Sequence, residues 1–290
     1  GLNTLTLESN DYSNFITDVT YPVADGIIYI KGQNILNQFR LDDNTIQTIL
    51  SSQQLNPPVS SFLYLDHAAN AYFKLDNVVS VSNLNDFILV EDCETVRVED
   101  SKFESLECSG ALFNLSADNY CRVEDGIFKD ISTNDGNGCF YFSQVVSMDE
   151  ILFRNNRFEA VTAENGPCLY VNSPSGSVDS VVFRNNDIFQ DRMGYTAING
   201  GVAYIRLSSV SLFRSYDNEI RNCEVTGYGG AYCFDVSAVN NLDIYNDDLH
   251  TIISNYDGGY ISVKNQITNT DISINGLTAD TCFSKAGSGG

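Results

Sequence analysis

The sequence predicts an all-β protein, a right-handed parallel β-helix of about ten coils with roughly 25–33 residues per coil. Three observations support this fold class. A short motif recurs at a nearly constant period, and a second strand-like segment separates its copies. In addition, no stretch repeats apolar residues with the period of an amphipathic helix, so we expect few helices.

The first repeated element is a strand, a polar corner and the start of a second strand. Its clearest copies read LFRNNRF at 152–158 and VFRNNDI at 182–188. Counted at the apolar residue that ends each copy, from Phe103 onward, the spacings are 25, 30, 30, 32, 29 and 28 residues. Such a period is typical of a solenoid. We therefore expect residues 1–290 to form one β-helix domain, with less regular coils in 1–90 and regular coils in 91–290.

The second element is a glycine followed by a short apolar run that contains an aromatic residue. Examples read GCFYF at 138–142, GPCLYV at 166–171 and GAYCF at 230–234. Glycine, and the asparagine that often precedes it, tolerate positive φ, which indicates a sharp corner before each strand. Two or three strands in about 29 residues fit a β-helix coil better than a leucine-rich horseshoe or a propeller blade.

Stacked coils place like residues beside like residues, about 4.8 Å apart. The repeats therefore predict an internal aromatic column, an internal apolar column and an amide ladder at a corner. The aromatic column comprises Phe153, Phe183 and Phe213. The apolar column comprises Phe158, Ile188, Ile220 and Leu249. The ladder comprises Asn155 and Asn185.

Arginines recur at the same position of three successive motifs, as Arg154, Arg184 and Arg214. Because the spacing is one period, we expect an outward column on a solvated face. Like charges in register repel, so we expect acids among Asp187, Asp217 and Glu219 to lie between these arginines.

Acidic residues strongly outnumber basic ones, with 38 Asp and Glu against 16 Lys and Arg. This charge excludes nucleic acid as a partner and disfavours anionic lipids and polyanionic polysaccharides. A divalent cation such as Ca²⁺ is the one cofactor that the acidic surface could attract. No apolar stretch is long enough to insert into a membrane.

The motifs resemble the repeats of polymorphic outer membrane proteins, which pair Phe-x-x-Asn with Gly-Gly-Ala-aliphatic. The matching segments here are 153–156 (FRNN), 183–186 (FRNN), 200–203 (GGVA) and 229–232 (GGAY). The resemblance covers 93–290 and is weak in 1–90. It implies a pectin-lyase-like right-handed β-helix exposed outside the cell. The segment 213–216 (FRSY) departs from the motif, and nothing resembles the barrel that follows such repeats in bacteria.

Eight cysteines, an even number, indicate an oxidising compartment. Aligning Tyr141 with Tyr170 places Cys139 beside Cys168 in the next coil, at a spacing that suits a disulfide. Buried free thiols are the alternative, and the other six cysteines have no assigned partner. Asn114 begins the one standard N-glycosylation sequon, Asn-Leu-Ser.

No catalytic, cofactor-binding or metal-binding residues are predicted. The two histidines, His67 and His250, lie far apart and belong to no recognisable ligand or catalytic motif. Asn269-Thr270-Asp271 resembles one element of polygalacturonases, but the accompanying motifs are absent. We therefore expect no enzymatic activity. A polysaccharide lyase or hydrolase and a glycan-binding adhesin module, which would use exposed tyrosines, remain the alternatives.

The residues at the two ends of the sequence would together form one coil. The segment 1–7 (GLNTLTL) alternates like a strand, and the residues after Leu277 together with those before Phe15 make one coil length. We therefore predict an extracellular structural protein that associates head to tail in a surface fibre, or a segment of a longer tandem array.

Overall fold

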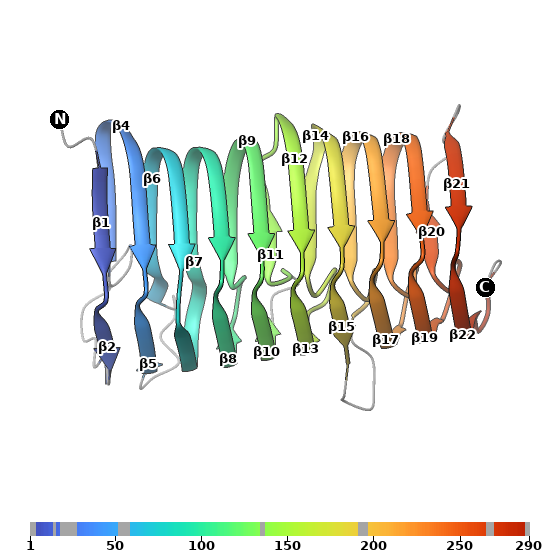
Figure 1. The fold of residues 1–290 in the computed structure, drawn as a ribbon, viewed down its shortest axis with the longest axis horizontal. Coiled ribbons are helices and arrows are strands. Elements are labelled where there is room, and N and C mark those ends of the chain that lie inside the picture. Colours follow the sequence, from blue (N-terminus) through green and yellow to red (C-terminus); the bar gives the residue numbers. More distant parts are fainter. Residues whose placement is uncertain are drawn as a thin grey trace.

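A computed structural model confirms an all-β fold of parallel strands (Figure 1). It describes residues 4–13, 16–17, 28–51, 59–133, 137–190, 197–264 and 270–287. The chain forms a β-solenoid of about eight turns, rather than the ten expected, and the described residues include no helix.

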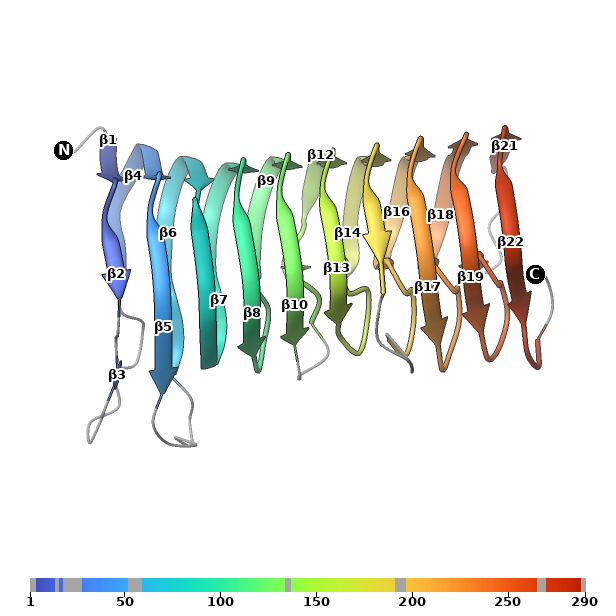
Figure 2. The same cartoon turned by 60° about the horizontal axis from the view of Figure 1, so that its bottom comes forward.

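The strands follow one another around the solenoid axis, and the two ends of the chain lie at opposite ends of that axis (Figure 1 and Figure 2). In chain order they are β1 (Thr4–Glu8), β2 (Asp11–Ser13), β3 (Ile16–Thr17), β4 (Ile28–Asp42), β5 (Thr45–Ser51), β6 (Val59–Lys74), β7 (Asn77–Glu99), β8 (Lys102–Cys108), β9 (Phe113–Glu124), β10 (Ile127–Thr133), β11 (Phe140–Phe142), β12 (Ser147–Arg154), β13 (Arg157–Thr162), β14 (Leu169–Arg184), β15 (Asp187–Phe189), β16 (Ala203–Tyr216), β17 (Glu219–Val225), β18 (Tyr232–Tyr245), β19 (Asp248–Ser254), β20 (Ile261–Val263), β21 (Asp271–Asn275) and β22 (Thr278–Ser284).

Each regular coil contributes three strand segments, which build three parallel faces. On face A, β11 pairs with β9 and β14; on face B, β12 pairs with different parts of the same two strands. On face C, β13 pairs with β10 and β15. Alternate side chains of these strands point inward and form one continuous apolar core.

The predicted apolar column is confirmed. Phe158 pairs with Ile188, Ile188 with Ile220, and Ile220 with Leu249 on face C. All four side chains are fully buried. The column continues toward the N-terminus at Phe128, whose ring stacks on Phe158 with centroids 4.7 Å apart.

The predicted aromatic column is correct for Phe153 and Phe183, whose rings stack 5.0 Å apart at 6°. It is wrong for Phe213. Phe213 pairs with Val181, and the register partner of Phe183 is Ser215, two residues further along the chain. A register irregularity between Ser173 and Ser177 accompanies this change. A shift of two residues keeps the inward orientation of alternate side chains, so Phe213 is still buried.

A left-handed residue turns the chain from face B to face C at most of the described corners; the corner between β6 and β7 has none. The non-glycine residues with positive φ at this corner are Ser9, Asp43, Asp100, Asp125, Asn155, Asn185, Asp217 and Asn246. Asn and Asp tolerate this conformation better than other side chains. The predicted contact is present, since Asn185 Nδ2 donates to Asn155 Oδ1 at 3.3 Å.

The predicted arginine column is only partly correct. Arg154 pairs in register with Arg184, but Arg214 pairs with Val182, because it shares the shift of Phe213. The acids that compensate these charges are also not the expected ones. Arg154 contacts Glu124 at 2.8 Å and Arg214 contacts Asp243 at 3.0 Å.

Candidate functional site

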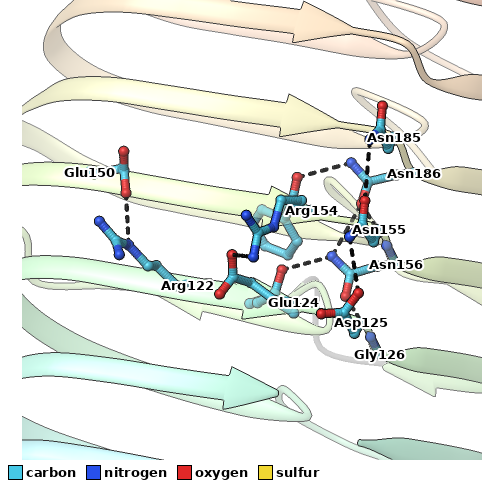
Figure 3. A network of polar contacts seen from close by, with 12 residues as sticks. Arg122, Glu124, Asp125, Gly126, Glu150, Arg154, Asn155, Asn156, Asn185 and Asn186 are labelled. Atoms are coloured by element: carbon cyan, nitrogen blue, oxygen red, sulfur yellow. Dashed lines mark hydrogen bonds and ion pairs between the residues drawn. The ribbon is translucent and has the colours of Figure 1, made fainter. Parts of the chain in front are cut away.

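A buried amide ladder lies one residue beyond the left-handed corner (Figure 3). Asn156, Asn186 and Asn218 are at most 2% exposed. The backbone N–H and Nδ2 of Asn156 both donate to Asn186 Oδ1, and those of Asn186 donate to Asn218 Oδ1. Each Nδ2 also donates to a carbonyl of the preceding coil, as Asn186 does to Phe153 at 3.0 Å. The ladder therefore satisfies buried donors and acceptors between coils.

The ladder ends at Asp247, a carboxylate with no exposed surface. Its Oδ1 accepts from the backbone N–H and Nδ2 of Asn218 at 2.9 and 3.1 Å. Its Oδ2 accepts from Ser215 Oγ at 2.5 Å and from the Tyr260 hydroxyl at 2.8 Å. Burial raises the pKa of Asp247 despite these donors. Asp247 has no surface open to a substrate, so this cluster belongs to the packed core.

Replacing Asp247 with asparagine is expected to leave stability at neutral pH unchanged or to raise it, because the amide keeps an acceptor for Asn218 without a buried charge. The raised pKa sets the pH dependence. The parent gains stability as pH falls through the folded-state pKa of Asp247, so the advantage of the variant should shrink in acid. Urea unfolding at neutral and acidic pH measures this difference, and an advantage that grows in acid would contradict the role of charge burial.

The structure places Cys139 and Cys168 side by side, as predicted. Cys139 donates its backbone N–H to Pro167 O at 2.7 Å, and the following residues, Phe140 and Leu169, are register partners. Both cysteines are buried and are free thiols in this structure. Burial raises the pKa of each thiol well above its ordinary value. The disulfide stays a prediction.

Asn114, the predicted glycosylation site, is partly buried on face A. Its Nδ2 donates to Asp86 Oδ2 at 3.1 Å, and Asp86 also accepts from the Ala111 N–H at 2.7 Å. Burial raises the pKa of Asp86. Asn114 therefore has a structural contact of its own, and its glycosylation stays a prediction.

Each histidine lies among carboxylates, an arrangement that the sequence did not reveal. His67 contacts Asp66, and its Nε2 lies 3.5 Å from Asp92 Oδ2. His250 Nε2 lies 3.2 Å from Asp248 Oδ1, close to Glu219. In both clusters a carboxylate comes from a neighbouring coil, so spacing along the chain could not predict it.

Arginine and tyrosine side chains form a column on the outer side of face B, near the N-terminal end. Arg40 pairs with Tyr72, Tyr72 with Arg97, and Arg97 with Arg122. The Arg40 guanidinium lies over the Tyr72 ring at 4.5 Å. The Arg97 guanidinium lies 6.0 Å from the centre of the Tyr120 ring. Cation–π contacts of this kind hold guanidiniums in fixed positions.

A cavity of about 540 Å³ opens beside this column, and we call it the Arg-Tyr groove. Its lining residues are Thr4, Asn37, Gln38, Arg40, Asn70, Ala71, Tyr72, Thr95 and Arg97. Its size lies within the range of small-molecule sites. The lining combines guanidiniums, amides, hydroxyls and one aromatic ring, which are the groups that recognise polar ligands with carboxylates or hydroxyls.

The C-terminal coil carries exposed apolar side chains, and we call this surface, formed by β21 and β22, the C-terminal end surface. Ile272 is 62% exposed, Ile274 56% and Phe283 40%. Their register partners in the preceding coil include Leu242 and Ile244, which are almost fully buried. The end surface thus presents core columns of the solenoid to solvent.

The same two columns reach β1 at the other end of the solenoid. Successive pairings connect Leu5 with Ile272 and Leu7 with Ile274 through the face B strands. Leu5 and Leu7 are partly buried and pack against the core. The columns at the two ends are therefore matched in register. Residues 1–3, Phe15 and residues 288–290, on which the sequence argument also relied, lie outside the described residues.

The fold defines this chain as a parallel β-solenoid. Comparison with known proteins gives no match to a protein-family model, a curated protein or a solved structure. The resemblance to polymorphic outer membrane protein repeats therefore depends on the short motifs alone. Within the described residues, no helix is long and apolar enough to cross a membrane.

Proposed function

We propose that this chain is an extracellular structural protein that associates head to tail, with β21 of one copy pairing in parallel with β1 of the next. The observation that carries the proposal is the C-terminal end surface, whose Ile272 and Ile274 occupy the same columns as Leu5 and Leu7. The even number of cysteines and the sequon at Asn114 favour an extracellular location.

The side chains that would meet at this junction are compatible. Ile272 would lie beside Leu5 and Ile274 beside Leu7, which continues both apolar columns. On the outer side of the strands, the same register places Asp271 beside Thr4, an acceptor beside a hydroxyl donor. Burying a fully exposed isoleucine side chain contributes about 1.5–3 kcal/mol. Ile272 and Ile274 are 62% and 56% exposed, so each would contribute a little over half of that value and favour association.

Sedimentation velocity over a range of concentrations tests this association. We expect the average mass of the parent to rise with concentration, and we expect the Ile272→Lys/Ile274→Lys double variant to remain a monomer, since it buries two charges at the junction. The matched control is Val146→Lys, because Val146 is 82% exposed outside the end surface. A parent that is monomeric throughout, or a double variant that associates equally well, would contradict the proposal.

The Arg-Tyr groove supports a second candidate function, the binding of an acidic oligosaccharide. The high net negative charge disfavours long polyanions, but this groove concentrates guanidiniums locally. Arg40 is already paired with Asp42 at 2.6 Å, whereas Arg97 lies beside Tyr120 and forms no ion pair with a residue that the structure describes. Arg97 is therefore the guanidinium that would meet a sugar carboxylate.

Calorimetric titration with a uronic-acid oligosaccharide and with a neutral oligosaccharide of equal length tests this function. We expect Arg97→Gln to weaken binding of the acidic sugar about 10-fold or more. Arg122→Gln, in the same column but outside the groove and paired with Glu150 at 2.9 Å, should bind as the parent does. Equal binding of both sugars, or no effect of Arg97→Gln, would exclude recognition of the carboxylate by Arg97.

A further inference from the structure

The buried amide ladder connects neighbouring coils in one direction only. At each step, the backbone N–H at the ladder position of one coil donates to the ladder side chain of the next coil, as Asn186 N–H does to Asn218 Oδ1 at 2.9 Å. That side chain donates in return to the carbonyl three residues before its partner, as Asn218 Nδ2 does to Phe183 O at 3.0 Å. Each ladder asparagine therefore uses an N–H and a carbonyl of the preceding coil.

Asn10 occupies the ladder position in the first described coil. Its backbone N–H and Nδ2 both donate to Asn44 Oδ1 at 3.1 Å, and Asn44 Nδ2 donates to Leu7 O at 2.9 Å. Asn44 has no exposed surface, whereas Asn10 is exposed, since no described coil precedes it. In this ladder geometry, Asn10 Oδ1 and its second amide hydrogen are available at the N-terminal end of the solenoid.

Leu277 occupies the ladder position in the last described coil. The next residue, Thr278, donates its N–H to Asp247 O at 2.9 Å, as Asp187 does to Asn156 O. The backbone N–H of Leu277 therefore lies where a ladder N–H donates to the coil that follows. No further described coil supplies an acceptor for it.

Two contacts within the chain show that a backbone N–H alone can continue the ladder. Leu75 N–H donates to Ser101 Oγ of the next coil at 3.0 Å. Gly126 N–H donates to Asn156 Oδ1 at 2.9 Å (Figure 3). Both acceptor residues are 2% exposed. A coil with leucine or glycine at the ladder position is thus connected to the next coil through the side chain of that next coil.

The apolar columns alone do not determine the register of a head-to-tail junction. Pairing Leu5 with Ile274 instead of Ile272 would shift β1 by two residues and would still direct Leu5 inward. The chain itself contains such a shift of two residues at Phe213. A hydrogen-bonding side chain at the junction removes this ambiguity, because every shifted register leaves buried polar groups without partners.

We infer that Asn10 fixes the register and direction of the head-to-tail junction by extending the amide ladder from one copy into the next. Asn10 Oδ1 accepts from the Leu277 N–H of the preceding copy, and Asn10 Nδ2 donates to Ile274 O of that copy. This inference rests on the association proposed above and adds the residue that selects the partner surface. Two N-terminal ends cannot join in this way, because neither supplies the N–H and the carbonyl.

Sedimentation velocity measures the contribution of Asn10 to association. Asn10→Ala should raise the dissociation constant about 10-fold or more, since it leaves the Leu277 N–H and Ile274 O without partners. Asn10→Ser should restore part of this loss, because serine is an accepting side chain elsewhere in the ladder. The matched control is Ser9→Gly, which should associate as the parent does. Ser9 is exposed at the same corner, and glycine tolerates its φ of 53°.

Disulfide trapping between copies measures the register itself. Thr4→Cys/Asp271→Cys reports the expected register, and Thr4→Cys/Ser273→Cys reports a shift of two residues. Thr4→Cys alone controls for the native cysteines, seven of which are buried. Oxidation should link copies through the first pair only, and adding Asn10→Ala should allow links through both pairs.

The outcomes separate the role of Asn10 from the association on which it rests. If Ile272→Lys/Ile274→Lys abolishes association but Asn10→Ala changes neither the dissociation constant nor the trapped register, the role of Asn10 is overturned and the head-to-tail association stands. Equal trapping of both cysteine pairs without Asn10→Ala would also overturn that role. A parent protein that is monomeric at every concentration would overturn both.

Discussion

Replacing Asn186 with alanine should lower the free energy of unfolding by about 3–5 kcal/mol, because each buried polar group left without a partner costs about 1–3 kcal/mol. The substitution removes the acceptor of the backbone N–H and Nδ2 of Asn156. It also removes the side-chain donor to Phe153 O and to Asn218 Oδ1. Denaturant unfolding followed by circular dichroism measures the loss.

The neighbouring residue provides the matched control. Asn185 is exposed, has a φ of 50° and contacts Asn155 on the outside of the corner. Asn185→Gly keeps a residue that tolerates this backbone and loses only an exposed hydrogen bond, so we expect a cost below about 1 kcal/mol. Equal costs for the two substitutions would show that the buried amide ladder contributes no more to stability than the exposed contact.

Replacing Phe183 with alanine should cost about 3–5 kcal/mol through lost burial and the cavity that remains. The Phe183 ring is fully buried. It stacks on Phe153 at 5.0 Å and also contacts Tyr232 and Phe213, with centroids 5.4 and 6.3 Å away. Because these neighbours belong to different coils or faces, the packed solenoid cannot easily close the space. Denaturant unfolding measures the effect.

Tyr256 is the aromatic control for this substitution. Its ring stacks on Tyr228, but the residue is 52% exposed. Tyr256→Ala should therefore cost about 1 kcal/mol or less, since little buried surface is lost. If Phe183→Ala unfolded no more readily than Tyr256→Ala, the assignment of the phenylalanine column to the core would be incorrect.

The coil period could be predicted from the sequence because stacked coils repeat the same chemistry at the same place. The column from Phe158 through Ile188 and Ile220 to Leu249 follows directly from that period. The position of Phe213 does not, since the register changes between Ser173 and Ser177. A sequence records the number of residues in a coil but not where an irregularity absorbs the extra ones.

The buried amide ladder could not be predicted from the sequence, because the two adjacent asparagines of each motif are chemically identical. The left-handed backbone of Asn155 keeps its own side chain exposed, whereas the next side chain, that of Asn156, is buried in the core. Only the corner geometry distinguishes them. Asp247 was missed for the same reason, since an acidic residue at a corner is normally exposed and solvated.

The candidate sites depend on contacts between coils of unequal length. Arg40, Tyr72 and Arg97 are register partners, although their separations along the chain are 32 and 25 residues. His67 meets Asp92 for the same reason. In the N-terminal part, where the repeat motif is faint, the sequence alone could not align these residues.

Electron microscopy of the protein at high concentration tests the head-to-tail proposal most directly. If β21 of one copy pairs with β1 of the next, unbranched filaments should show an axial repeat of about 40–50 Å, because successive strands lie about 4.8 Å apart. The Ile272→Lys/Ile274→Lys variant should yield single particles under the same conditions. Isolated particles of the parent protein, with both ends free at every concentration, would contradict the proposal.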